Sequence, residues 1–212
     1  IRVCTRSGQN YFCSISDITE SFVRADILEK EAESTELPCR IYLFQGLPKN
    51  DKMEWIIQKT VELGVYEVIP VAMKNCVVKL DDKKAKSKVM RWQAIAESAA
   101  KQSKRSLIPE VKMPMSYKEA VAYAKELDVK LVPYENEHGM AGTKAAMEQI
   151  KKGESIAVFI GPEGGFAPEE IALVQDEMQL ISLGKRILRT ETAGIAALAI
   201  LGYQLESSDM IE

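Results

Sequence analysis

The sequence predicts an α/β protein with a mostly parallel sheet, preceded by a small antiparallel sheet or barrel. Up to residue 37 the chain has short runs in which apolar and polar residues alternate, a pattern typical of half-buried strands. After residue 38, short apolar runs alternate with longer amphipathic segments. Parallel strands need crossover connections, which helices provide, so this alternation indicates a parallel sheet covered by helices on both faces.

Residues 1–37 and 38–212 are expected to form two domains. The polar stretch 33–38 ends in a proline and is the best candidate for the linker between them. Because the numbered chain begins at Ile1 rather than at a methionine, we expect the first domain to be incomplete. Its predicted strands span residues 11–15 and 22–28.

In the second domain, Asp51 and Glu54 have the spacing of a capping box, and Gly64 is expected to close the helix that follows. The predicted strands span residues 41–44, 65–73, 129–134, 155–160 and 180–183. Further helices are predicted over residues 87–103, 117–127, 143–151, 168–178 and 191–206. Ligands of such sheets bind beyond the carboxyl ends of the strands, so the loops after residues 131, 160 and 183 are where chemistry is expected.

The charge distribution is uneven. The chain has 28 basic and 31 acidic residues, a net charge of −3 with its one histidine neutral. Residues 74–105 contain ten basic and three acidic residues, a local charge of +7, so the remainder sums to −10. Two interpretations stay open: a local surface for a polyanion, or a solvated helix face.

Cysteine usage and hydropathy indicate a cytoplasmic protein. The four cysteines are widely separated, which favours reduced thiols over a disulfide framework, and no metal site is expected. The longest apolar run, residues 193–201, is about half as long as a membrane-spanning helix. Neither a membrane span nor a secretory signal is predicted, so no membrane partner is expected.

The loop after the apolar run 156–160 has three glycines around one carboxylate, Glu163. Glycines let the backbone approach a ligand closely, so we interpret this as a binding loop; the alternative is a tight turn with glycines for packing only. It matches neither the phosphate loop nor the dinucleotide fingerprint. The carboxylate would repel phosphate and would suit a ligand with hydroxyls or positive charge.

A second loop turns at Gly184 and leads into an apolar helix. It brings Arg186, Arg189 and Glu191 to a helix N-terminus, where free N–H groups and the positive end of the helix dipole favour ligand binding. One arginine is expected to face the ligand while the other pairs with Glu191, and which does which stays open.

Together these motifs, G-P-E-G-G-F and L-G-x-R-I-L-R-x-E-T-A, make the chain resemble the RsmE family of 16S ribosomal RNA uridine-N3 methyltransferases, of the SPOUT class. The resemblance continues upstream through residues 43–49, 51–59, 62–65, 76–79 and 91–96. It implies a C-terminal trefoil knot, a PUA-like β-barrel for the N-terminal domain, S-adenosylmethionine as cofactor and a homodimer that pairs through residues 193–203.

The resemblance also implies which residues line the cofactor pocket, and they fall in the three strand-end loops. They are Leu131, Pro133, Tyr134 and Glu135, then Gly161, Pro162, Glu163, Gly164 and Gly165, then Leu183, Gly184, Ile187, Leu188 and Thr192.

Methylation at N3 requires loss of the uridine imide proton. Our hypothesis assigns Arg189, or failing that Arg186, to stabilising the uridine anion, with Glu191 orienting that arginine. The RNA is expected to be 16S ribosomal RNA or the assembled small subunit, bound by one stripe of the 87–103 helix and its flanks. That stripe comprises Lys84, Lys88, Arg91, Gln102 and Arg105.

Two other functions remain open: a nucleotide-handling enzyme with a glycine loop, and a non-catalytic RNA-binding module with a vestigial pocket. His138 is interpreted as a surface-loop histidine rather than a general base. Trp55 and Trp92 are expected to lie in the core.

Overall fold

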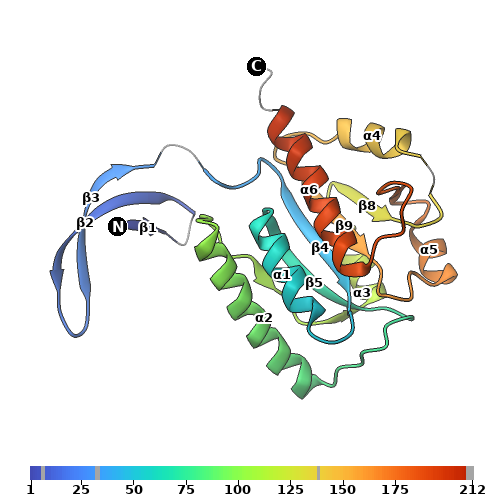
Figure 1. Cartoon of the computed structure of the whole chain (residues 1–212), viewed down its shortest axis with the longest axis horizontal. Helices are drawn as coiled ribbons and strands as arrows, with labels where there is room; N and C mark the ends of the chain where they lie inside the picture. The colour runs from blue at the N-terminus through green and yellow to red at the C-terminus, as the bar shows by residue number, and fades with distance from the viewer. Residues whose placement is uncertain (6–7, 32–33, 138, 209–212) are drawn as a thin grey trace.

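The computed structural model describes residues 1–5, 8–31, 34–137 and 139–208, so the prediction for His138 lies outside the described residues. The chain forms two sheets, a small one at the N-terminus and a large one surrounded by helices (Figure 1). Among the described residues, no helix combines the length and the apolar character that crossing a membrane requires.

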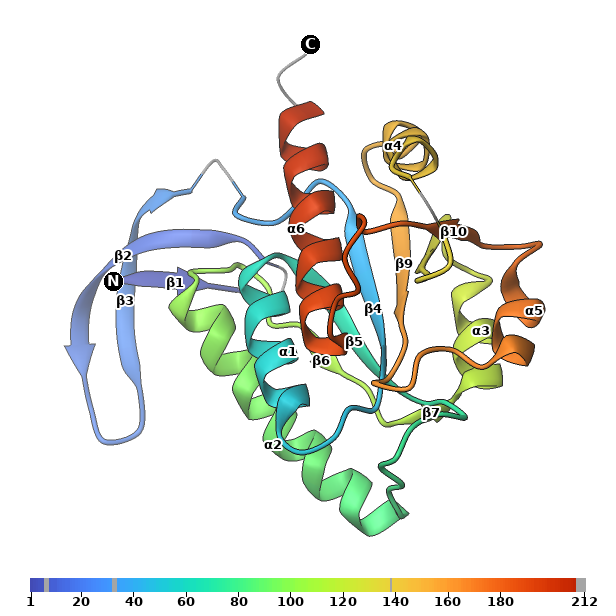
Figure 2. The ribbon, with the colours of Figure 1, turned by 45° about the vertical axis from the view of Figure 1, so that its right-hand side comes forward.

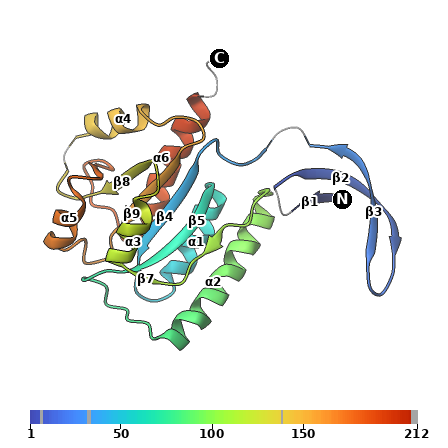
Figure 3. The same cartoon turned by 180° about the vertical axis from the view of Figure 1, so that it is seen from behind.

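The small sheet is antiparallel and has the order β1-β2-β3. It comprises β1 (Arg2–Cys4), β2 (Asn10–Ile18) and β3 (Val23–Lys30), so the two strands predicted here are confirmed and β1 is added. The sheet projects to one side of the molecule (Figures 1 and 3). It is held to the turn after α2 by side-chain hydrogen bonds, from Arg2 to the carbonyl of Lys104 (2.8 Å) and from Asn10 to the hydroxyl of Ser106.

The large sheet is parallel throughout, as the alternating sequence pattern predicts, with the order β10-β8-β9-β4-β5-β6 and β7 also paired to β5. Its strands are β4 (Arg40–Gly46), β5 (Val65–Ala72), β6 (Glu110–Val111), β7 (Met115–Ser116), β8 (Val129–Pro133), β9 (Ser155–Ile160) and β10 (Gln179–Ile181). The two-residue strands β6 and β7 are too short to leave a period in the sequence, and they were not predicted.

Helices cover both faces of the large sheet, which makes three layers (Figure 2). On one face lie α1 (Lys52–Glu62), α2 (Asp82–Gln102), α4 (Ala141–Glu148) and α6 (Thr190–Ser208). On the other lie α3 (Tyr117–Ala124) and α5 (Pro168–Val174). Alternation along β4 explains the two cores: Ile41 and Leu43 enter the first, and Tyr42 and Phe44 enter the second. Phe44 stacks on Phe159 of β9 with ring centroids 4.3 Å apart.

The start of α1 corrects one prediction. Asp51 does precede the helix, but its side chain makes no capping hydrogen bond. Its carboxylate instead lies 3.5 Å from the ammonium of Lys88, and Glu54 pairs with Arg91 at 2.7 Å, so both acids face α2. The predicted stop is confirmed, because α1 ends at Glu62 and Gly64 follows in the left-handed region (φ 93°).

The two tryptophans differ. Trp92 is buried between α2 and the sheet, as predicted, whereas the prediction for Trp55 is wrong: its side chain is 52% exposed on α1. The ammonium of Lys59 lies 5.0 Å from the centre of the Trp55 ring, a cation–π contact one turn along the helix.

Candidate active site

A cavity of about 570 Å³ opens at the carboxyl edge of the large sheet. Its walls come from the ends of β8 and β9, from the segment between β10 and α6, and from one side chain of α1. Residues named from the sequence that line it are Pro133, Tyr134, Glu135, Gly161, Pro162, Glu163, Gly165, Leu183, Gly184, Arg186, Ile187, Leu188 and Arg189. The three strand-end loops therefore meet in one cavity.

Three of the predicted pocket residues lie elsewhere. Leu131 is fully buried in the core, because its side chain alternates with that of Val132 along β8 and faces the helices of the first layer. Gly164 packs its backbone against Asn75, outside the cavity. Thr192 is exposed on the first turn of α6, where its N–H donates to the carbonyl of Arg189 (2.9 Å).

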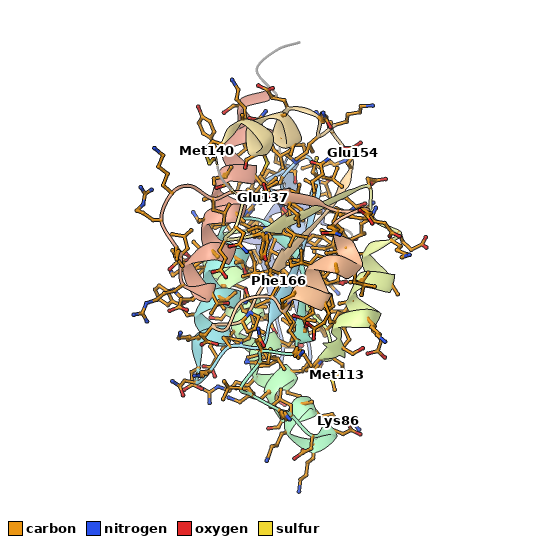
Figure 4. The ribbon with its side chains drawn as sticks, turned by 90° about the vertical axis from the view of Figure 1, so that its right-hand side faces the viewer. Lys86, Met113, Glu137, Met140, Glu154 and Phe166 are labelled. Atoms are coloured by element: carbon orange, nitrogen blue, oxygen red, sulfur yellow. The ribbon has the colours of Figure 1, made fainter. Side chains whose placement is uncertain are left out.

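Other lining residues were not predicted. They are Lys52, Glu137, Ile160, Phe166, Ser182, Lys185, Thr190 and Ala193. Glu137 and Phe166 are labelled in Figure 4, which faces this side of the molecule. Most of them neighbour predicted residues along the chain, but Lys52 reaches the cavity from α1, and no local pattern in the sequence connects it to loops more than 80 residues away.

The glycine loop is held by close contacts on both sides. A Cβ on Gly46, at the end of β4, would lie 2.7 Å from the backbone nitrogen of Pro162, so only glycine fits there. On the other side, the Asn75 amide donates to the carbonyls of Gly164 (3.0 Å) and Gly165 (3.2 Å). Gly165 itself is in the left-handed region (φ 67°). The loop is thus fixed before any ligand arrives.

A charged cluster forms one wall. The ammonium of Lys52 lies 3.1 Å from a carboxylate oxygen of Glu163 and 3.1 Å from one of Glu191. These two contacts, that with Glu191 first, raise the pKa of Lys52. Burial alone would raise the pKa of Glu163, but the Lys49 backbone N–H (3.0 Å) and the Lys52 ammonium outweigh it, and the pKa is lowered.

This cluster corrects the role expected for Glu191. Its partner is Lys52 of α1 rather than Arg186 or Arg189. Both arginines are exposed at the cavity mouth, and within the described part of the chain neither has an ion-pair partner. Two guanidinium groups without carboxylate partners are therefore available to a ligand that carries or develops negative charge.

Comparisons with known proteins identify the chain. Residues 35–202 match a family model described as an RNA methyltransferase domain. Ribosomal RNA small subunit methyltransferase E of Bacillus subtilis is 39% identical over 207 residues, which cover 96% of this chain and 81% of that protein. The chain belongs to the ribosomal RNA small subunit methyltransferase E family.

Two solved structures resemble this family member. The methyltransferase E of Neisseria gonorrhoeae, bound to S-adenosyl methionine, is 33% identical with a TM-score of 0.78, covering 95% of this chain and 81% of that one. A methyltransferase of Legionella pneumophila, in complex with the same cofactor, is 32% identical with a TM-score of 0.80 and the same coverage.

For a member of an RNA methyltransferase family, the basic segment around α2 is the next feature of interest. Lys84, Lys88 and Arg91 lie on the helix as predicted, and each has a carboxylate partner, Asp81, Asp51 and Glu54 respectively. Gln102 is exposed at the last turn.

The expectation for Arg105 is wrong. The helix ends at Gln102, and Lys104 adopts the left-handed conformation (φ 57°), which turns Arg105 away from the stripe. The Arg105 side chain is only 4% exposed; it pairs with Glu36 and donates to the carbonyls of Val61 (3.1 Å) and Val65 (2.6 Å). Arg105 is a structural residue that ties the linker to the large sheet.

Proposed function

We propose that this chain transfers a methyl group from S-adenosylmethionine to N3 of a uridine in 16S ribosomal RNA. The observation that supports this best is the single cavity made by the three strand-end loops, in a chain that matches cofactor-bound relatives over 95% of its length. The cavity volume of about 570 Å³ is in the range typical of small-molecule sites.

The residues present fit this cofactor. Glu135, Glu137 and Glu163 offer carboxylates to ribose hydroxyls and to a positively charged sulfur, and the glycines at 161 and 165 let the backbone come close. Backbone groups of residues 183–188 are suited to adenine. When bound, the cofactor supplies a methyl group on a sulfonium, which is reactive toward a nitrogen nucleophile.

The chain's own contribution is to make the uridine nitrogen nucleophilic. The N3 proton is held at neutral pH; a neighbouring guanidinium favours the anionic base, and the proton passes to solvent at the exposed cavity mouth. Arg189, or failing that Arg186, has this role in the proposal, since both stand at the cavity mouth without a carboxylate partner among the described residues. A base within folded RNA would be flipped out to reach it.

The finer architecture is part of the same proposal. The small sheet of residues 1–37 belongs to a PUA-like β-barrel domain that binds RNA, and residues 38–212 belong to a SPOUT domain with a C-terminal trefoil knot. Two copies pair through the exposed side of α6, where Ala199 and Tyr203 face solvent. The substrate is the RNA or the assembled small subunit, and the enzyme acts in the cytoplasm.

The test is a methyl-transfer assay. Purified protein is incubated with tritiated S-adenosylmethionine and with small ribosomal subunits or naked 16S RNA from a strain that lacks the gene. The RNA is then digested and its nucleosides are identified by mass spectrometry. N3-methyluridine is expected.

Two results would contradict the proposal. If the protein binds RNA in the absence of S-adenosylmethionine but transfers no methyl group in its presence, an RNA-binding module with a vestigial pocket would be favoured. Calorimetric binding of ATP with none of S-adenosylmethionine would favour a nucleotide-handling enzyme.

A further inference from the structure

Three lysines near the start of α2 are left without carboxylate partners. In the described part of the chain, Lys79, Lys83 and Lys86 are exposed and form no ion pair, whereas Lys84 and Lys88 pair with Asp81 and Asp51. Among the described residues of 74–105, three of the four exposed lysines without an ion pair are therefore near the start of α2, and the fourth is Lys104 after its end. These lysines differ from those of the stripe expected from the sequence.

Two of the three lysines share one face of α2 with a methionine. Lys83 and Lys86 are three residues apart on the helix, and Met90 follows Lys83 by seven, so the three share a face. The Met90 side chain is 74% exposed. Ala85 and Trp92, on the opposite side of the helix, are buried. We call Lys83, Lys86 and Met90 the lysine face; Lys79 is in the segment that precedes α2.

The lysine face is at the same edge of the sheet as the cavity. The segment that links β5 to α2 touches the glycine loop through Asn75, and the N–H of Lys74 donates to Glu170 of α5 (2.8 Å). The start of α2 extends beyond the sheet from there (Figures 1 and 3), with Lys86 labelled at its tip in Figure 4. A long ligand could contact both places at once.

The charge at this tip comes from side chains. Asp81 caps α2 by accepting from the N–H of Lys84 (2.8 Å), so a free N-terminal amide of the helix is already used. Lysine ammonium groups act as point charges that neutralise phosphates without reading base edges. An exposed thioether beside them offers apolar contact to a ribose or an unstacked base.

We propose that the lysine face binds the sugar–phosphate backbone of the ribosomal RNA that flanks the target nucleotide. The inference rests on the proposed function and deepens it, because it names where the RNA leaves the cavity. The contact is electrostatic and independent of sequence, so it sets affinity and orientation while the cavity selects the base.

The experiment compares two double variants that lose the same charge. Lys83→Gln/Lys86→Gln changes the lysine face, and Lys101→Gln/Lys125→Gln changes two exposed lysines at the ends of α2 and α3. Affinity for a 16S RNA transcript is measured between about 50 and 300 mM KCl, a range over which the Debye length falls about twofold. The slope of log affinity against log salt concentration is negative. For the first variant we expect its magnitude to decrease by about 1.4 to 1.8, the effect of losing two phosphate contacts.

The control variant should keep the wild-type slope, and both should bind S-adenosylmethionine as wild type does in calorimetry. Equal slopes for the two variants would overturn the proposal. Binding to phosphatidylglycerol vesicles is measured in parallel, and a first variant that lost affinity for the vesicles but kept it for RNA would also overturn the proposal. The proposed function is read separately, from methyl transfer by the wild type. If the wild type transfers no methyl group, the salt slopes still test RNA binding by the lysine face. If the wild type transfers methyl normally and the first variant has the wild-type slope, only the lysine face is rejected.

Discussion

The side-chain amide of Gln45 donates a 2.9 Å hydrogen bond to the hydroxyl of Thr190, 145 residues further along the chain. That hydroxyl donates in turn to the carbonyl of Gly161 (2.7 Å). Both side chains are buried, and the two bonds join the end of β4, the start of α6 and the glycine loop. One hydroxyl therefore sets the relative position of two cavity walls.

Replacing that hydroxyl tests its importance. Thr190→Val keeps the shape of the side chain but removes the hydrogen bonds to the Gly161 carbonyl and to one N–H of the Gln45 amide, whose other N–H still donates to the carbonyl of Gly46. Each unpaired buried group costs about 1 to 3 kcal/mol. We expect cofactor affinity to fall about tenfold, equivalent to about 1.4 kcal/mol. Thr190→Ser, which keeps the hydroxyl, should restore it. Wild-type affinity of the valine variant in calorimetry would contradict this role.

The two arginines at the cavity mouth can be separated by their kinetics. Arg189→Ala is expected to lower the rate of methyl transfer by about 10² to 10³, the usual cost of removing one electrostatic donor from a developing anion. Because Arg189 is exposed and has no ion-pair partner among the described residues, the unfolding free energy should stay unchanged, and cofactor binding should remain measurable by calorimetry. Arg186→Ala is the matched control. Full activity of the Arg189 variant, with loss in the Arg186 variant, would exchange their roles.

Gly46 predicts a steric effect. An alanine methyl there would press on the Pro162 backbone, which cannot rotate away, and overpacking of this kind costs about 1 to 3 kcal/mol. We expect Gly46→Ala to lower the unfolding free energy in urea and to weaken cofactor binding. At Gly142 of α4 an added Cβ would meet nothing within 4 Å, so Gly142→Ala should leave both measurements unchanged or raise stability slightly.

Glu163 predicts a dependence of stability on pH. Its folded-state pKa is lowered, so the ionised carboxylate stabilises the fold above its unfolded pKa of about 4.3, and this contribution is lost as the pH falls through the folded value. The difference in unfolding free energy between wild type and Glu163→Gln should be constant from about pH 6 to 8 and shrink below about pH 4.3. A difference that grows on acidification would show that the sign is wrong.

Substitutions at Arg105 and Glu36 are expected to lower the free energy of unfolding rather than the affinity for RNA. Glu36→Gln leaves the buried guanidinium without its counter-charge, and breaking such a pair costs about 3 to 5 kcal/mol. Glu36→Gln/Arg105→Met should be less destabilised than Glu36→Gln alone, as urea unfolding would show. If Arg105→Met instead folded with wild-type stability and lost RNA affinity, the arginine would be an RNA contact after all.

The architecture could be predicted because a parallel sheet requires short apolar strands to alternate with amphipathic helices along the sequence. Every long strand and helix of the large sheet is present, with ends shifted by a few residues, since fraying and capping depend on contacts that periodicity does not contain. The three loops were found for the same reason, as carboxyl ends of parallel strands share one edge. Leu131 was misplaced because one position along a strand decides between core and cavity.

What remained hidden depends on distant pairs. Lys52 reaches Glu163 and Glu191 only once α1 packs beside α6, and nothing near Lys52 in the sequence indicates this. Arg105 matched the helical stripe by spacing, but a single left-handed residue, Lys104, ended that spacing. Trp55 is exposed although its hydrophobicity predicts burial. The errors at Lys52 and Trp55 concern the direction of one side chain, whereas the error at Arg105 follows from where α2 ends.

Apart from Lys52, every residue that lines the cavity lies at or beyond Pro133, and the wall at Thr190 belongs to the last helix. A nascent chain is synthesised from its N-terminus, so it builds β4 and β5 long before it has a pocket. The cavity is therefore complete only once the chain has been synthesised through Ala193 and the start of α6 has docked. Premature termination upstream of α6 would thus yield fragments that are catalytically silent.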